Sequence, residues 1–240
     1  QHLVEEVRSA RLDEALVDRA ARRILRQKVE LGLLDPDFDP AVQGQDRDLD
    51  SAPNRAIALK MAEQSIVLLR NDGLLPLAAG DKAPGQIALI GPCGDEARTF
   101  MGCYSYPNHV LNKYPALGMG IESASFAAAL AQEFARSEVV VEQGVPVLQP
   151  DRSGFDAAVQ AAHDADVAVL AVGDLAGLFG LGTSGEGCDS VDLTLPGLQA
   201  ELVEAVLATG TPTVLVVISG RPYSLGGFAD RCAAVIQAFM

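Results

Sequence analysis

The chain has 240 residues, of which 49% are hydrophobic and 21% are charged, and its formal net charge is −14 at pH 7. This apolar content supports a sizeable core and excludes global disorder. So acidic a chain is repelled by phosphate backbones and by anionic lipid surfaces, and we therefore expect neither nucleic acid nor a membrane among its partners. No apolar run in the sequence approaches the roughly 18 residues that a membrane-spanning helix needs.

The cysteines give no sign of a metal site. Cys93, Cys103, Cys188 and Cys232 show no CxxC spacing and do not cluster with histidine at the spacing of zinc ligands. A chain of this length does not need disulfides to stabilise a core, so we expect free thiols, with a Cys93–Cys103 bridge as the alternative. The residues imply no metal and no cofactor.

The first segment predicts a helix over about residues 13–31. Apolar residues that include Leu16 and Ile24 recur at helical spacing, and arginines fill the other face. The aspartate- and proline-rich residues 35–40 then break the regular structure. The polar, charged stretch that follows predicts an extended linker over residues 41–52.

Beyond residue 53 the sequence alternates between amphipathic segments and short, almost continuously apolar runs. The former predict helices, and the latter, which are bounded by turn signals, predict buried strands. The expected helices cover residues 53–64, 125–135, 153–162 and 197–208, and the expected strands cover residues 65–69, 87–90, 139–141, 167–172, 213–218 and 234–239. This alternation is typical of an α/β fold, in which helices cover both faces of a mostly parallel sheet.

In such a sheet the functional residues gather in the loops that follow the carboxyl ends of the strands. Two of these loops, residues 91–121 and 173–196, are unusually long for a compact α/β unit. The first carries Tyr104, Asn108 and His109, whose rings and amide can stack on and hydrogen-bond to a sugar. The alternative is a well-packed lid with ordinary polar groups at its surface.

The second long loop places Glu186 between two glycines, Gly185 and Gly187. A carboxylate on such a tip can reach into a neighbouring cleft, and the absent side-chain bulk lets a substrate approach closely. An ordinary solvated glutamate is the alternative interpretation. Residues 180–185 also match the GxGxxG pattern, but the match lies several residues past the strand and an acidic irregular stretch follows it, so we interpret it as a chance match.

Several motifs, in order along the chain, resemble glycoside hydrolase family 3, the family of β-glucosidases, β-xylosidases and related exo-acting enzymes. RLDEALVDRAARRILRQKVELGLLD resembles the end of the family's N-terminal (β/α)8 barrel, and AEQSIVLLRNDGLLPL resembles the entry to its α/β sandwich domain. IALIGP, GTSGEGCD, LTLPGLQAELV and VVISGRP continue the match. The resemblance implies that residues 1–40 are the C-terminal helix of an absent barrel, that residues 41–52 are a linker, and that residues 53–240 are a sandwich domain truncated at its C-terminus.

The resemblance also implies a function. In such enzymes the glutamate of the SGEG loop is commonly the general acid/base, which implies this role for Glu186. The family's nucleophilic aspartate lies on a barrel strand, in a segment that this chain does not contain. The implied reaction is retaining hydrolysis of terminal, non-reducing β-linked glucose or xylose. The implied partners are a β-linked oligosaccharide or glycoside and the absent barrel domain.

Two other functions stay open from the residues alone. A non-catalytic α/β module that binds a carbohydrate or another small ligand could use the same crevice, and a nucleotide-binding protein is a more distant alternative. An upstream barrel with an aspartate within reach of Glu186 would favour the enzyme. With the barrel absent, we expect the apolar face of the first helix, including Leu16, Ala20 and Ile24, to be exposed.

Overall fold

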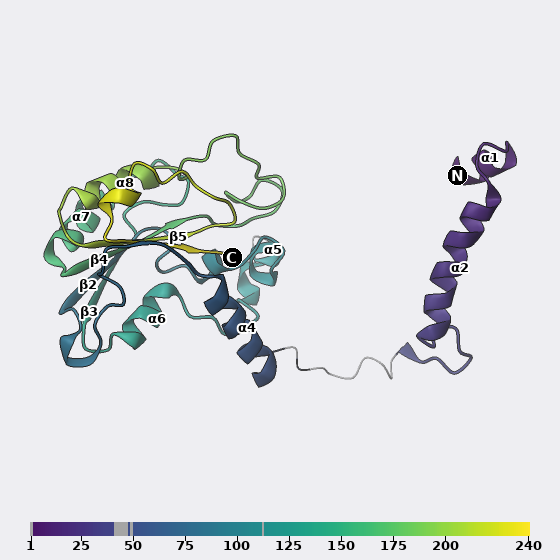
Figure 1. Ribbon diagram of the computed structural model, residues 1–240, viewed down its shortest axis with the longest axis horizontal. Helices are drawn as coiled ribbons and strands as arrows, with labels where there is room; N and C mark the ends of the chain where they lie inside the picture. The colour runs from purple at the N-terminus through teal and green to yellow at the C-terminus, as the bar shows by residue number, and fades with distance from the viewer. Residues whose placement is uncertain (1, 41–47, 49, 112) are drawn as a thin grey trace. The chain divides into compact units, whose positions relative to one another are not determined.

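The computed structural model describes residues 2–40, 48, 50–111 and 113–240. The chain forms two compact units, Gln1–Ser51 and Ala52–Met240 (Figure 1). Residues 41–47 and 49 of the predicted linker lie outside the described residues. Of the helices that the structure describes, none has the length and apolar character needed to cross a bilayer.

The first unit contains the helices α1 (His2–Arg8) and α2 (Glu14–Glu30). Asp13 caps α2, because its side chain accepts a hydrogen bond from a backbone amide of the first turn at 2.9 Å. The sequence predicted α2 to within one residue at each end. It missed α1, which is too short to show a helical repeat of apolar residues. Leu16 and Ile24 are 44% and 55% exposed, which confirms the expected exposure of the apolar face of this helix.

The described residues of the second unit form a six-stranded sheet flanked by helices. The strands are β1 (Val67–Asn71), β2 (Gln86–Ile90), β3 (Glu138–Glu142), β4 (Val167–Gly173), β5 (Thr213–Ile218) and β6 (Ala234–Ala238). The α-helices are α4 (Ala52–Ser65), α5 (Tyr106–Val110), α6 (Phe126–Glu133), α7 (Phe155–Asp164) and α8 (Gln199–Leu207). In the order β1-β6-β5-β4-β2-β3, β1 runs antiparallel to β6 and the other neighbours are parallel. The expected α/β fold with a mostly parallel sheet is confirmed.

Each face of the sheet has its own apolar core, because successive strand residues point to opposite faces. On one face, Leu170 and Leu215 pack with Leu202 of α8 and with alanines of α7. On the other face, Leu89 and Val169 belong to a cluster with buried residues of α6. Figure 1 shows α7 and α8 on one side of the sheet and α6 on the opposite side. The long apolar runs of the sequence therefore reflect strands that are buried on both faces.

Several element boundaries differ by one or two residues from those that the sequence predicted, and two of these differences have a clear local cause. The first strand begins at Val67 rather than at residue 65, because α4 continues through Ser65. The helix predicted from residue 153 begins at Phe155. There the carboxylate of Asp151 accepts a hydrogen bond from the Ser153 amide at 2.8 Å, which forms a turn before the helix.

The carboxyl ends of β4 and β5 approach each other so closely that only glycine fits between them. Gly173 has a φ of 137°, and a Cβ atom there would lie 1.9 Å from the carbonyl oxygen of Ile218. The side-chain amide of Gln199, which is fully buried, pairs with both backbone groups of Gly173, at 2.7 and 2.9 Å. These contacts fix the point at which the loop of residues 173–196 leaves the sheet.

Gly173→Ala should destabilise the second unit by about 2 kcal/mol or more, because the methyl group meets the backbone of β5 and the φ value is unfavourable for alanine. Urea unfolding followed by circular dichroism measures the change. Gly226→Ala is the matched control, since nothing lies within 4 Å of a Cβ atom there, and it should change stability by no more than about 0.5 kcal/mol. Equal unfolding midpoints for the two variants would contradict the prediction.

Candidate active site

Glu186 lies exposed on the loop that follows β4, and its carboxylate contacts the other long loop. The hydroxyl of Tyr104 donates a hydrogen bond to Oε2 of Glu186. Tyr104 belongs to the loop that follows β2, and β2 and β4 are parallel neighbours in the sheet. The structure therefore brings together the two loops in which the sequence predicted functional residues, at the edge formed by the carboxyl ends of the strands.

The hydrogen bond to Glu186, together with the charge of that carboxylate, raises the pKa of Tyr104 above the ordinary value of a tyrosine. Tyr104 is 68% exposed, so this shift does not come from a buried position. Tyr104 is therefore a neutral donor at physiological pH, and it holds one oxygen of the carboxylate in place.

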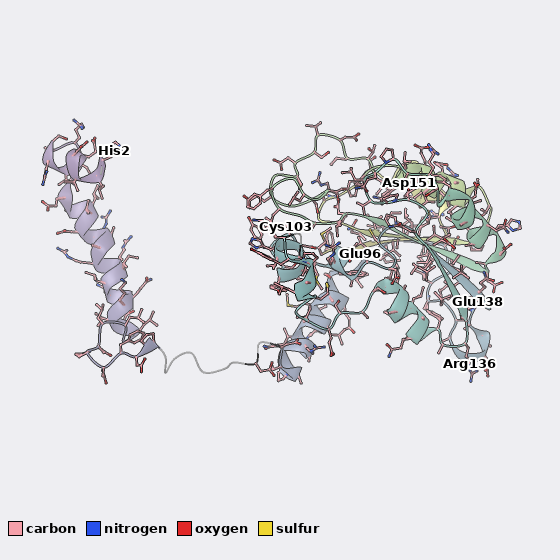
Figure 2. All side chains as sticks on the ribbon, turned by 180° about the vertical axis from the view of Figure 1, so that it is seen from behind. His2, Glu96, Cys103, Arg136, Glu138 and Asp151 are labelled. Carbon is pink, nitrogen blue, oxygen red and sulfur yellow. The ribbon has the colours of Figure 1, made fainter. Side chains whose placement is uncertain are left out.

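Glycines give the tip of this loop its shape. Gly185 has a φ of 109°, and a Cβ atom there would lie 2.4 Å from the carbonyl oxygen of Gly177 and 2.5 Å from the Cβ atom of Cys103, which is labelled in Figure 2. The backbones of Gly177 and Gly182 approach each other equally closely, because a Cβ atom at residue 182 would lie 2.4 Å from the amide nitrogen of Gly177. The segment before Glu186 is thus folded tightly onto the start of its own loop.

The same contacts explain the GxGxxG pattern over residues 180–185. Gly182 and Gly185 both pack against Gly177 inside the loop. A dinucleotide site needs a helix directly after its glycines, whereas α8 begins only at Gln199. The local structure agrees with the interpretation of this pattern as a chance match.

The two remaining candidate residues lie on α5. Asn108 is only 2% exposed, and its side-chain amide donates to the carbonyl oxygen of Met101 at 2.5 Å and to those of Arg98 and Gly102 at 3.4 Å. These bonds point the amide into its own loop, where it holds the turn that precedes α5. His109 is exposed in the last turn of α5. Of the four predicted site residues, the structure thus joins Glu186 directly to Tyr104.

Asp174, which from the sequence is an alternative to Glu186 as acid/base, is the first residue after β4, and its side chain is fully buried. Its carboxylate accepts hydrogen bonds from the hydroxyl of Thr183 at 2.7 Å, from the amide of Gly220 at 3.2 Å and from the hydroxyl of Tyr223. Burial, together with this bond, raises the pKa of Tyr223. The position directly after a parallel strand is the signal in the sequence that points to Asp174.

Two of the residues that donate to this carboxylate, Thr183 and Tyr223, line a cavity of about 370 Å³. Its lining includes Thr183, Asp189, Arg221 and Tyr223, and it does not include Glu186. Arg221 donates to the carbonyl oxygen of Cys188 at 2.6 Å, which ties the second half of the loop to the segment after β5. The four cysteines, all within the described residues, are free, as the sequence predicted.

A family model described as the glycosyl hydrolase family 3 C-terminal domain matches residues 66–240. The chain belongs to glycosyl hydrolase family 3. This membership confirms the resemblance that the sequence motifs showed, and it agrees with the six-stranded sheet and its flanking helices.

Named family members are similar over almost the whole chain. A β-xylosidase of Formosa agariphila is 33% identical over an aligned length of 230 residues, and the alignment covers 93% of this chain and 29% of that protein. A periplasmic β-glucosidase of Salmonella typhimurium is 29% identical over an aligned length of 254 positions, gaps included, and the alignment covers 97% of this chain and 31% of that protein. The crystal structure of a β-glucosidase from Listeria innocua in complex with isofagomine has the same fold, with a TM-score of 0.75, 24% identity and coverage of 98% of this chain and 30% of that one. The chain therefore spans less than a third of the length of these relatives.

Removal of the Glu186 side chain should let Tyr104 ionise at a lower pH, because the neutral phenol loses the carboxylate that stabilises it. Titration of Glu186→Ala and of the unmodified chain, followed by the ultraviolet absorbance of tyrosinate, measures this shift. The chain has four tyrosines, so the same pair is compared in a Tyr104→Phe background, where the difference between the two curves should vanish. A difference that persists in that background would show that another tyrosine senses Glu186.

Proposed function

We propose that this chain is part of a retaining, exo-acting β-glycosidase and that Glu186 is its general acid/base. The observation that carries the proposal is the position of this carboxylate, exposed on a loop at the carboxyl edge of the sheet and held on one oxygen by Tyr104. Membership in family 3 and similarity to proteins named β-xylosidase and β-glucosidase support a substrate with a terminal β-linked xylose or glucose.

The second carboxylate of the reaction belongs to the barrel part of the longer protein. A retaining glycosidase uses two carboxyl groups that lie about 5–5.5 Å apart, one as nucleophile and one as acid and base. In the first step the nucleophile attacks the anomeric carbon, while Glu186 donates its proton to the departing glycosidic oxygen. In the second step Glu186 takes a proton from water, which attacks the anomeric carbon and releases the sugar with its configuration retained.

The bond between Tyr104 and Glu186 assigns different tasks to the two carboxylate oxygens. Oε2 accepts from Tyr104, so Oε1 is the oxygen that holds and transfers the proton. We assign Tyr104 and His109, both exposed, to contact with the substrate at this edge. Asn108 acts from behind them, because its amide holds the backbone of residues 98–102.

Glu186→Ala in the complete protein should lower turnover of a natural disaccharide by about 10²–10⁴-fold, because the leaving oxygen is no longer protonated. An aryl glycoside with an activated leaving group needs little protonation, so glycosylation of the enzyme should be impaired less. Azide should then rescue turnover and give a glycosyl azide of retained β configuration, because a small anion replaces the water that needs a base.

The matched control is Glu133→Ala, which removes an exposed glutamate from the C-terminal end of α6. It should leave turnover of both substrates unchanged. Near-normal turnover of the disaccharide by Glu186→Ala would refute the proposal. Asp174 and Asp189, on the same loop, would then be the next candidates, and of these two Asp189 is the exposed one.

The 240-residue chain by itself should not release nitrophenol from aryl β-glucosides or β-xylosides, because half of a two-carboxylate site cannot form the glycosyl intermediate. The purified chain is assayed beside a preparation of Glu186→Ala, which reports any contaminating hydrolase. Turnover by the chain that disappears in Glu186→Ala would contradict the prediction and place both carboxyl groups within these residues.

A further inference from the structure

We propose that Asp174 is a positioning residue for Glu186 and acts through the hydroxyl of Thr183. This inference rests on the proposed role of Glu186 as acid and base. It starts from a carboxylate that is fully buried at the carboxyl end of β4. Among the described residues, the groups that donate to this carboxylate are two hydroxyls and one backbone amide, none of which carries a charge.

Burial of a carboxylate costs free energy unless hydrogen bonds to its oxygens compensate for the lost water. The buried position of Asp174 therefore indicates a structural or functional role. Asp174 lies where three segments meet. Its own backbone continues β4, Thr183 precedes the tip of the long loop, and Gly220 and Tyr223 belong to the segment after β5. A single carboxylate thus ties the loop to the two central strands of the sheet.

The link from Asp174 to the tip of the loop is short and well bonded. The Thr183 hydroxyl donates to Asp174 at 2.7 Å and accepts from the Leu175 amide at 3.1 Å. The backbone amide of Thr183 donates to the carbonyl oxygen of Leu175 at 2.9 Å, and the amide of Gly177 donates to the carbonyl oxygen of Ser184 at 3.0 Å. Residues 183 and 184 are thereby held alongside residues 175–177.

Glu186 comes directly after this held segment, so few backbone torsions separate it from a fixed point. Ser184 is buried, and Gly185 leaves no room for a Cβ atom between Gly177 and Cys103. A shift of residues 183 and 184 therefore moves the Glu186 carboxylate as well. Displacement of a catalytic group by about 1 Å can cost roughly 100-fold in rate. The bonds of the buried Asp174 thus give the acid a defined position.

The test is the pair Thr183→Val and Thr183→Ser in the complete protein. Valine has the shape of threonine but removes the hydroxyl, whereas serine retains the hydroxyl that bonds Asp174. Thr183→Val should lower kcat for a poor leaving group by on the order of 10- to 100-fold, with KM little changed and with a smaller loss for an activated aryl glycoside. Thr183→Ser should restore most of the rate.

A double-mutant cycle with Glu186→Ala separates positioning from a general structural effect. If Thr183 acts through Glu186, Thr183→Val should cause no further loss of the glycosylation rate once Glu186 is alanine. The control is Thr194→Val, which also replaces threonine by valine on the same loop, but at an exposed position. It should leave the rate unchanged. Should Thr183→Val fail to fold, Tyr223→Phe removes another donor to Asp174 and should give the same pattern.

The outcomes distinguish this inference from the proposed function on which it rests. If Glu186→Ala shows neither dependence on the leaving group nor rescue by azide, the role of Glu186 is refuted and the inference falls with it. If Glu186→Ala behaves as proposed, but Thr183→Val and Tyr223→Phe match the unmodified enzyme, the inference alone is overturned. It is also overturned if the losses caused by Thr183→Val and Glu186→Ala are fully additive.

Discussion

The site depends on the close approach of two backbones at the carboxyl ends of β4 and β5. Gly173 lies so near the carbonyl group of Ile218 that no side chain fits between them, and the buried amide of Gln199 satisfies its backbone groups. This contact keeps the two central strands in register up to their last residues. The loops that carry Asp174 and Tyr223 begin from these fixed ends, so their residues can meet at hydrogen-bond distance.

Two of the carboxylates on the loop of residues 173–196 have surroundings that differ sharply. Asp174 is fully buried and accepts three hydrogen bonds from neutral donors, so its side chain holds neighbouring segments together. Glu186 lies at the exposed tip and accepts from Tyr104, so it is accessible to a ligand. Environment rather than residue type separates the two roles, as it does wherever paired carboxyl groups take different parts in a reaction.

The sequence predicted the accessibility of Glu186, because the local surroundings of that residue are informative. The glycines on both sides of Glu186 and the preceding strand indicated an accessible carboxylate, and the structure exposes it. Its partner Tyr104 lies 82 residues away along the chain, so their contact exists only once β2 and β4 are neighbours. For Asn108 the local sequence was not sufficient. Its side-chain amide donates hydrogen bonds to carbonyl groups of its own loop and does not lie at the exposed surface.

The sequence by itself determined the α/β class, the positions of most strands and helices, and the two loops that hold the candidate site. These features follow from apolar periodicity and turn residues, which act over a few positions of the chain. Only the tertiary structure decided that β1 runs antiparallel to β6, and that Asp174 is buried beneath Thr183, Gly220 and Tyr223. The physical reason is that strand order and hydrogen bonds between distant segments depend on how the whole sheet assembles, and no local pattern records that choice.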